Sequence, residues 1–205
     1  MPLTDQQKEL IKASVPALKE HGSEVTKVFY DQLIGDNPAL KDVFNYTNQV
    51  NQHQPRALSG AVYAYAANID NLGALNGAVD LICNKHASLF IQPEQYVLVG
   101  RYLLAAMKEV LGEALTPELL EAWTVAYGDL ANIFIQKEAS LYKHAKGWTD
   151  WKEFRIAKKV RESKVITSFY LEPVDERVKP LPPFLPGQVG VSHSKLCPRF
   201  PSSID

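Results

Sequence analysis

One stretch, residues 72–96, constrains this chain more than any other. It reads LGALNGAVDLICNKHASLFIQPEQY. Apolar side chains recur there at the spacing of one helix face, and the face ends in His86: Leu75, Val79 and Ile82. His86 therefore lies in the last turn and points the way the core residues point. It is the candidate for holding an iron or another metal from one side.

A histidine at the end of a helix has an ordinary explanation, because it interacts favourably with the helix dipole. Two polar residues on otherwise apolar faces favour a different interpretation of His86. Tyr96 lies in the first turn of the next predicted helix, and Glu138 lies on the apolar stripe of the last one. A buried carboxylate is costly unless it is paired. A metal-bound imidazole usually passes its second N–H to such a group, so the three residues suit a hydrogen-bonded relay.

The remaining periodicity predicts an all-α region up to about residue 146. Thr4 and Gln7 form a capping-box pattern at its start. A short helix should end near Phe44 and be followed by a polar loop. The longer predicted helices span residues 4–20, 23–34, 55–68, 93–112 and 117–144, and the helix whose last turn contains His86 lies between the third and the fourth of them.

The composition changes after this region. The segment Val165–Leu171 is rich in β-branched and aromatic residues, which predicts a strand. Seven of the thirteen prolines lie from Pro173 onward. They exclude long helices there and weaken any assignment of a central strand.

Composition and missing motifs exclude several function classes. The formal net charge of −1 gives no reason to propose nucleic acid or a membrane surface as a partner. Two distant cysteines favour a reducing compartment. The polar N-terminus and the lack of long apolar runs predict a soluble, cytoplasmic protein. Glycine-rich phosphate loops and hydrolase elbows are also missing from the sequence.

Two further polar residues lie near predicted core faces. Tyr30 suits a ligand-facing hydroxyl, but it fits a core aromatic with its hydroxyl at the rim equally well. Gln54 extends the face of Leu58, but it also fits a solvated residue in a first helical turn.

The chain resembles the flavohaemoglobins over residues 3–146. The matching segments are KASVPAL, VFYDQL, NPALKDVFN, NQHQPRAL, NKHASLFIQPEQYVLVG and AWTVAYGDLANIFIQKEASLY. The resemblance implies an all-α globin domain over residues 1–146. Residues 147–188 resemble the first strands of a ferredoxin-reductase-like FAD-binding barrel, and residues 189–205 form an atypical, irregular tail.

The resemblance also implies roles for individual residues around haem b. His86 would be the proximal iron ligand, with Glu138 and Tyr96 hydrogen-bonded behind it. Tyr30 and Gln54 would line the distal side, where O2 and NO bind. Three residues would pack around the haem itself, above the iron, on the haem plane and at the haem edge: Leu58, Phe44 and Lys85.

The family reaction is nitric oxide dioxygenation, in which NO and O2 give nitrate. A flavin domain fed by NAD(P)H supplies the electrons. Pro186-Gly187-Gln188 matches a motif of that domain, but no R-x-Y-S motif for FAD follows. We therefore expect the FAD and NAD(P)H sites to be missing, a truncated chain, and an external reductase for sustained turnover.

Three alternatives remain open from the sequence. The chain could be a non-enzymatic oxygen carrier or gas sensor of the single-domain bacterial globin type. It could also be a non-functional fragment with exposed strands, or a helical bundle that binds no haem.

Overall fold

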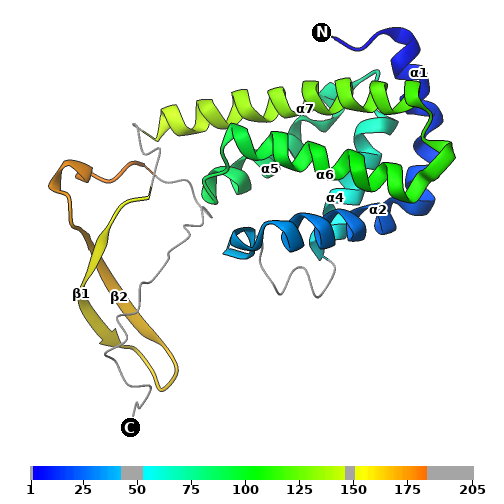
Figure 1. Ribbon diagram of the computed structural model, residues 1–205. Coiled ribbons are helices and arrows are strands. Elements are labelled where there is room, and N and C mark those ends of the chain that lie inside the picture. The colour runs from blue at the N-terminus through cyan, green and yellow to red at the C-terminus, as the bar shows by residue number, and fades with distance from the viewer. Residues whose placement is uncertain (1, 43–52, 146–150, 184–205) are drawn as a thin grey trace.

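The structure is a computed structural model that describes residues 2–42, 53–145 and 151–183. Figure 1 shows the described α-helices gathered in one part of the molecule and, beside it, a β-hairpin. Phe44 lies outside the described residues. Among those residues, no helix combines the length and the apolar character needed to cross a bilayer.

Helices make up the described structure up to residue 145, which confirms the all-α prediction. The α-helices are α1 (Asp5–Ala13), α2 (Val15–Asp36), α4 (His53–Ala67), α5 (Asn76–Ser88), α6 (Pro93–Leu111) and α7 (Pro117–His144). Short 3₁₀ turns join or extend them at η1 (Pro38–Asp42), η2 (Leu72–Leu75) and η3 (Gly112–Ala114).

Capping explains where several helices begin. The predicted capping box of α1 forms, because the Thr4 hydroxyl accepts from Gln7 N and the Gln7 side chain accepts from Thr4 N. Thr116 caps α7 in the same way by accepting from Leu119 N. Pro93 and Pro117 occupy first-turn positions, where a missing N–H costs nothing.

The predicted break between the first two helices is wrong by several residues. The chain turns at Ser14 rather than at His21-Gly22, and α2 then runs unbroken through both of these residues. Pro16 explains the position of the break, because it lacks the N–H that would bond back to Lys12. Gly22 remains helical and lies against the Ser59 side chain, where α2 packs on α4.

The core lies between α2, α4, α6 and α7, and the predicted faces point into it. On α2, Val25, Phe29 and Leu33 are at most 2% exposed. On α6, Leu103 and Met107 are buried, and Trp123 of α7 is buried as well. These helices form the frame against which α5 packs through α7.

Gly100 of α6 lies against the Tyr127 ring of α7. A Cβ there would lie 2.8 Å from Tyr127 Cδ1, which is well inside van der Waals contact. The Tyr127 ring cannot move freely, because its hydroxyl donates to the Tyr96 carbonyl oxygen at 2.6 Å. This contact and the hydrogen bond therefore fix the position of the Tyr96 backbone relative to α7.

Gly100→Ala is expected to lower the free energy of unfolding by about 1–3 kcal/mol, the usual cost of overpacking. Gly128→Ala on α7 is the matched control, since a Cβ there meets nothing within 4 Å. The control should be neutral or more stable by about 1 kcal/mol, from helix propensity. Urea unfolding of the two variants measures both values, and equal stability would contradict the packing argument.

Beyond the helices, β1 (Phe154–Arg161) pairs antiparallel with β2 (Thr167–Pro173). The register shifts between Ile156 and Lys158. Because β2 begins at Thr167, the predicted strand Val165–Leu171 starts two residues too early. Val165 and Ile166 lie in the turn, where their backbone N–H groups donate to Ser163 Oγ. Several apolar residues of the hairpin are exposed.

Candidate functional site

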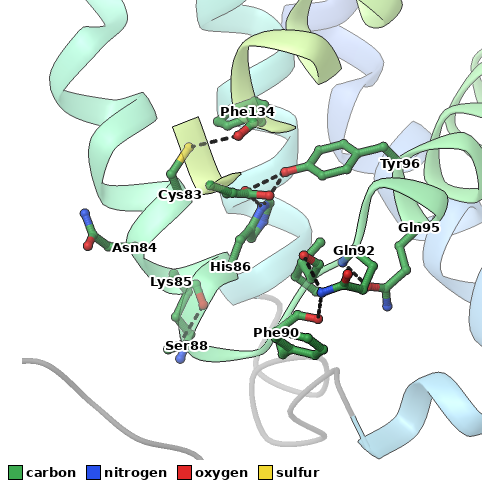
Figure 2. Close-up of polar contacts among 12 residues, drawn as sticks. Cys83, Asn84, Lys85, His86, Ser88, Phe90, Gln92, Gln95, Tyr96 and Phe134 are labelled. Carbon is green, nitrogen blue, oxygen red and sulfur yellow. Dashed lines mark hydrogen bonds and ion pairs between the residues drawn. The ribbon is translucent and has the colours of Figure 1, made fainter. Parts of the chain in front are cut away.

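Three polar side chains meet where α5, α6 and α7 converge. His86 Nδ1 lies 2.9 Å from Tyr96 Oη and 2.9 Å from Glu138 Oε1. Tyr96 Oη donates to the same Glu138 oxygen at 2.6 Å. Figure 2 shows His86 and Tyr96 pointing toward this junction from two elements. The predicted relay is therefore present in the fold, and 52 residues of sequence separate its histidine from its carboxylate.

Proton counting assigns the tautomer of His86. The tyrosine hydroxyl has one proton, and it is already donated to Glu138. A carboxylate only accepts, so the hydrogen bond between His86 and Glu138 needs a proton on Nδ1. A neutral imidazole protonated at Nδ1 has its lone pair at Nε2. The network thus leaves the lone pair of Nε2 available to a metal.

Burial strengthens this network. Glu138 is 2% exposed and Tyr96 is 8% exposed, whereas the His86 side chain is 31% exposed. Burial, followed by the hydrogen bond to Glu138, raises the pKa of Tyr96 far above its ordinary value. Tyr96 therefore remains a hydrogen-bond donor throughout the physiological pH range. The exposed part of the site is the imidazole, and its supporting groups lie inside.

Phe134 and Cys83 pack around the three residues. The Phe134 ring stacks on Tyr96 with centroids 6.3 Å apart and lies 6.0 Å from the imidazole of His86. Cys83 Sγ donates to the Phe134 carbonyl oxygen at 4.0 Å, one turn before His86 on α5 (Figure 2). The Asp80–Lys137 ion pair ties the same two helices together at the surface. These contacts fix α5 against α7.

Cys83 should be unreactive in the folded chain. Burial, followed by the charge of Glu138, raises the pKa of its thiol from 9.0 to about 12. In a Cys197→Ser background, alkylation at pH 8 should be at least about hundredfold slower than after unfolding, because the thiolate is the nucleophile. Leu81→Cys in a Cys83→Ser, Cys197→Ser background is the exposed control on the same helix. Equal alkylation rates for the two thiols would contradict the burial of Cys83.

The same thiol makes stability depend on pH. Between pH 9 and about 12 the unfolded chain releases the Cys83 proton, while the folded chain retains it. The folded state then binds more protons, so stability falls as pH rises through this window. Cys83→Ala should reduce the pH dependence of urea unfolding between pH 9 and 10.5. Parallel curves for the parent and the variant would exclude this contribution.

The second group of predicted residues lies on α2 and α4, which pack together. Tyr30 is 7% exposed, and burial raises the pKa of its hydroxyl. Gln54 and Leu58 are half-buried on α4, and Leu58 packs against the core. Lys85 is exposed on α5. The predicted contact of Phe44 lies outside the described residues.

Sequence reasoning missed the supporting roles of two tyrosines. Tyr127 donates to the Tyr96 carbonyl, and Tyr142 donates to the Ile91 carbonyl at 3.0 Å. Tyr142 follows Glu138 by four residues, so the same helical spacing that indicated Glu138 also indicates Tyr142. The backbone acceptors carry no signal in the sequence.

A comparison with protein families gives a match to the globin model over residues 27–134, which is more than half of the chain. The chain belongs to the globin family. This match includes α5 with His86 and α6 with Tyr96, and it ends four residues before Glu138. The prediction of an all-α globin domain is thus confirmed.

Known relatives agree with this assignment. The flavohemoprotein of Oceanobacillus iheyensis is 53% identical over 184 residues, which are 88% of this globin and 45% of the relative. The globin thus spans about half the length of the curated relatives it matches.

Two solved structures are similar to the fold. A bacterial globin from Campylobacter jejuni has 37% identity and a TM-score of 0.65, covering 68% of this chain and 99% of that one. The flavohemoglobin from Malassezia yamatoensis, solved with bound FAD and heme, has 33% identity and a TM-score of 0.73. This second match covers 84% of the present chain and 46% of the other. The helices with the short antiparallel sheet therefore have a counterpart in a solved flavohemoglobin.

Proposed function

We propose that this globin binds haem b through His86 Nε2 and catalyses nitric oxide dioxygenation, in which NO and O2 give nitrate. The observation that carries the proposal is the contact of His86 Nδ1 with Glu138 and Tyr96. An imidazole with an anionic partner behind it is basic and donates electron density to a metal. That property favours activation of oxygen over reversible storage.

The residues fit a haem group. Haem iron in globins takes one histidine, so the lack of a three-residue metal cluster among the described residues is no obstacle. His86 is half-exposed, and its Nδ1 proton is already directed at Glu138. Bound haem would supply a redox-active iron able to bind diatomic ligands. His86 would hold that iron, and Glu138 would hold the Nδ1 proton in place.

On the opposite side, Tyr30 and Gln54 would face the bound gases. Burial raises the pKa of the Tyr30 hydroxyl, so the hydroxyl stays protonated and can donate to a ligand with partial negative charge. Leu58, half-buried on the same helix as Gln54, would limit access above the iron. Phe44 and Lys85 would contact the haem plane and the haem edge.

We assign haem binding to residues 1–146 and interpret residues 147–188, which include the hairpin, as the start of a flavin-binding barrel. Repeated turnover needs electrons, and the 205 residues contain no R-x-Y-S motif. An assay of these 205 residues would therefore include an added reductase. We place the protein in the cytoplasm, because its two distant cysteines suit a reducing compartment.

Haem reconstitution and stopped-flow mixing test the proposal. The purified chain should bind one haem, shown by a Soret band. When reduced and oxygenated, it should convert one equivalent of NO to nitrate. The 205-residue chain should oxidise NADH no faster than free haem does. A missing Soret band would refute haem binding, and sustained NADH-dependent turnover would refute the need for an additional reductase.

A second candidate is a non-enzymatic oxygen carrier or gas sensor. The similarity to the Campylobacter jejuni globin supports it, because 99% of that chain matches 68% of this one. Reduction of the oxidised haem separates the two functions. A dioxygenase needs a reductase that restores the ferrous form at a useful rate after each turnover, whereas a carrier binds and releases O2 without such repeated reduction.

A further inference from the structure

The turn that ends the His86 helix is strained. Phe90 has φ of 57°, and it is the only non-glycine residue with positive φ in the described part of the chain. A residue other than glycine rarely adopts this left-handed backbone conformation, because its Cβ crowds the following carbonyl oxygen. Such strain persists only where the surroundings hold the backbone in place, and it is concentrated at functional sites.

Backbone hydrogen bonds join this strained turn to His86 itself. Phe90 N donates to the Ala87 carbonyl at 3.2 Å, and Ile91 N donates to the His86 carbonyl at 3.1 Å. This pair of bonds is the Schellman motif, which normally has glycine at the position of Phe90. The bond that closes the motif therefore has the carbonyl of His86 as its acceptor.

Helix α7 holds the turn from the other side. The Tyr142 hydroxyl donates to the Ile91 carbonyl at 3.0 Å, and its ring lies edge-on to Phe90 with centroids 5.6 Å apart. Glu138 lies one turn earlier on the same helix. Helix α7 thus contacts the end of α5 at two points, through the His86 side chain and through the turn that follows it.

We propose that Phe90 and Tyr142 act as positioning residues for His86, and we name this pair the Phe90–Tyr142 clamp. The clamp fixes the backbone of His86 relative to α7 and so sets the bond between His86 Nδ1 and Glu138. The role of the clamp rests on the proposed function, in which His86 Nε2 is the iron ligand. Glycine at position 90 would relieve the strain but would offer Tyr142 no ring to pack against.

Tyr142→Phe tests the clamp while keeping the ring. It removes only the hydroxyl that holds the Ile91 carbonyl. Amide hydrogen exchange at Phe90 and Ile91 should become about fivefold faster, as expected for the loss of one net hydrogen bond. Tyr102→Phe is the matched control, because its hydroxyl donates to Asp36 and not to the turn. Equal exchange in both variants would overturn the clamp, and this measurement also works on the haem-free chain.

A spectroscopic readout connects the clamp to His86. In the haem-loaded ferrous chain, Tyr142→Phe should lower and broaden the iron–histidine stretching band in resonance Raman spectra. Tyr102→Phe should leave the band unchanged. An unchanged band in Tyr142→Phe would overturn the positioning role even if haem binds normally. Failure of the parent chain to bind haem would refute the proposed function, and amide exchange would then decide the clamp.

Phe90 is tested by a pair of substitutions. Phe90→Gly and Phe90→Ala both remove the ring, but only alanine keeps the strain at positive φ. Phe90→Ala should therefore melt at the lower temperature, and both variants should shift the iron–histidine band as Tyr142→Phe does. A parent-like band in Phe90→Gly would show that the ring is dispensable and would overturn the clamp.

Discussion

His86→Ala is expected to reduce haem affinity by more than about hundredfold. Loss of a residue that only hydrogen-bonds to a metal ligand typically costs about 10–100-fold, and loss of the ligand itself should cost more. The reason is geometric. Nδ1 contacts Glu138 and Tyr96, so Nε2 is the proposed iron-coordinating atom, and the substitution removes it. No cluster of three metal-binding side chains exists in the described ranges to replace it. Haem transfer to apomyoglobin, followed at the Soret band, measures the loss.

Two controls make this result specific. His144→Ala removes a histidine whose Nδ1 interacts with the Ser140 carbonyl at 2.7 Å, and it should retain haem as the parent does. Free imidazole should restore the spectrum of His86→Ala, because it fills the space left by the ring and supplies the missing nitrogen. Tight haem retention by His86→Ala would place the ligand elsewhere and contradict the assignment.

The sequence predicted those parts of the fold that depend on a regular period. The buried faces of α2 and α6 follow from a helical repeat of apolar residues, and Val25 and Met107 are buried as expected. Glu138 was conspicuous because a carboxylate interrupted such a face. Its partners could be predicted because few polar groups are available on neighbouring faces.

The features that sequence could not predict depend on contacts between distant segments. Gly22 looks like a helix end in isolation, but it continues α2 where Ser59 of α4 lies against it. Nothing in the residue type of Phe90 predicts positive φ, because α7 supplies the contacts that hold it. Propensity is local, whereas both outcomes are decided by tertiary packing.

The site residues also divide into those that the sequence could predict and those that it could not. His86, Tyr96 and Glu138 could be proposed together because each is a polar residue on an apolar helix face. Tyr30 and Gln54 are consistent with two interpretations even in the structure, since a buried tyrosine on α2 suits both a core and a ligand-facing role. A substitution at Tyr30 that preserves stability but changes ligand binding would distinguish them.

Glu138→Ala is expected to lower the free energy of unfolding of the haem-free chain by about 3 kcal/mol. The substitution leaves the buried Tyr96 hydroxyl without its acceptor and removes one partner of His86 Nδ1. Each buried donor left unpaired costs about 1–3 kcal/mol, and the half-exposed imidazole regains part of this from water. Urea unfolding measures the loss. Glu121→Ala, at an exposed position on the same helix, should change stability by less than about 0.5 kcal/mol.

Glu138→Gln separates charge from shape. The amide fills the same volume and still accepts a hydrogen bond, so the loss of stability should be smaller than in Glu138→Ala. The negative charge behind His86 disappears, however, and the iron–histidine band should fall in frequency while NO consumption drops about 10–100-fold. A double-mutant cycle of Glu138→Ala with Tyr96→Phe should give a coupling of about 0.5–3 kcal/mol, because the Tyr96 hydroxyl donates directly to Glu138. Additive effects in that cycle, together with a parent-like band in Glu138→Gln, would mean that the carboxylate merely fills space beside His86.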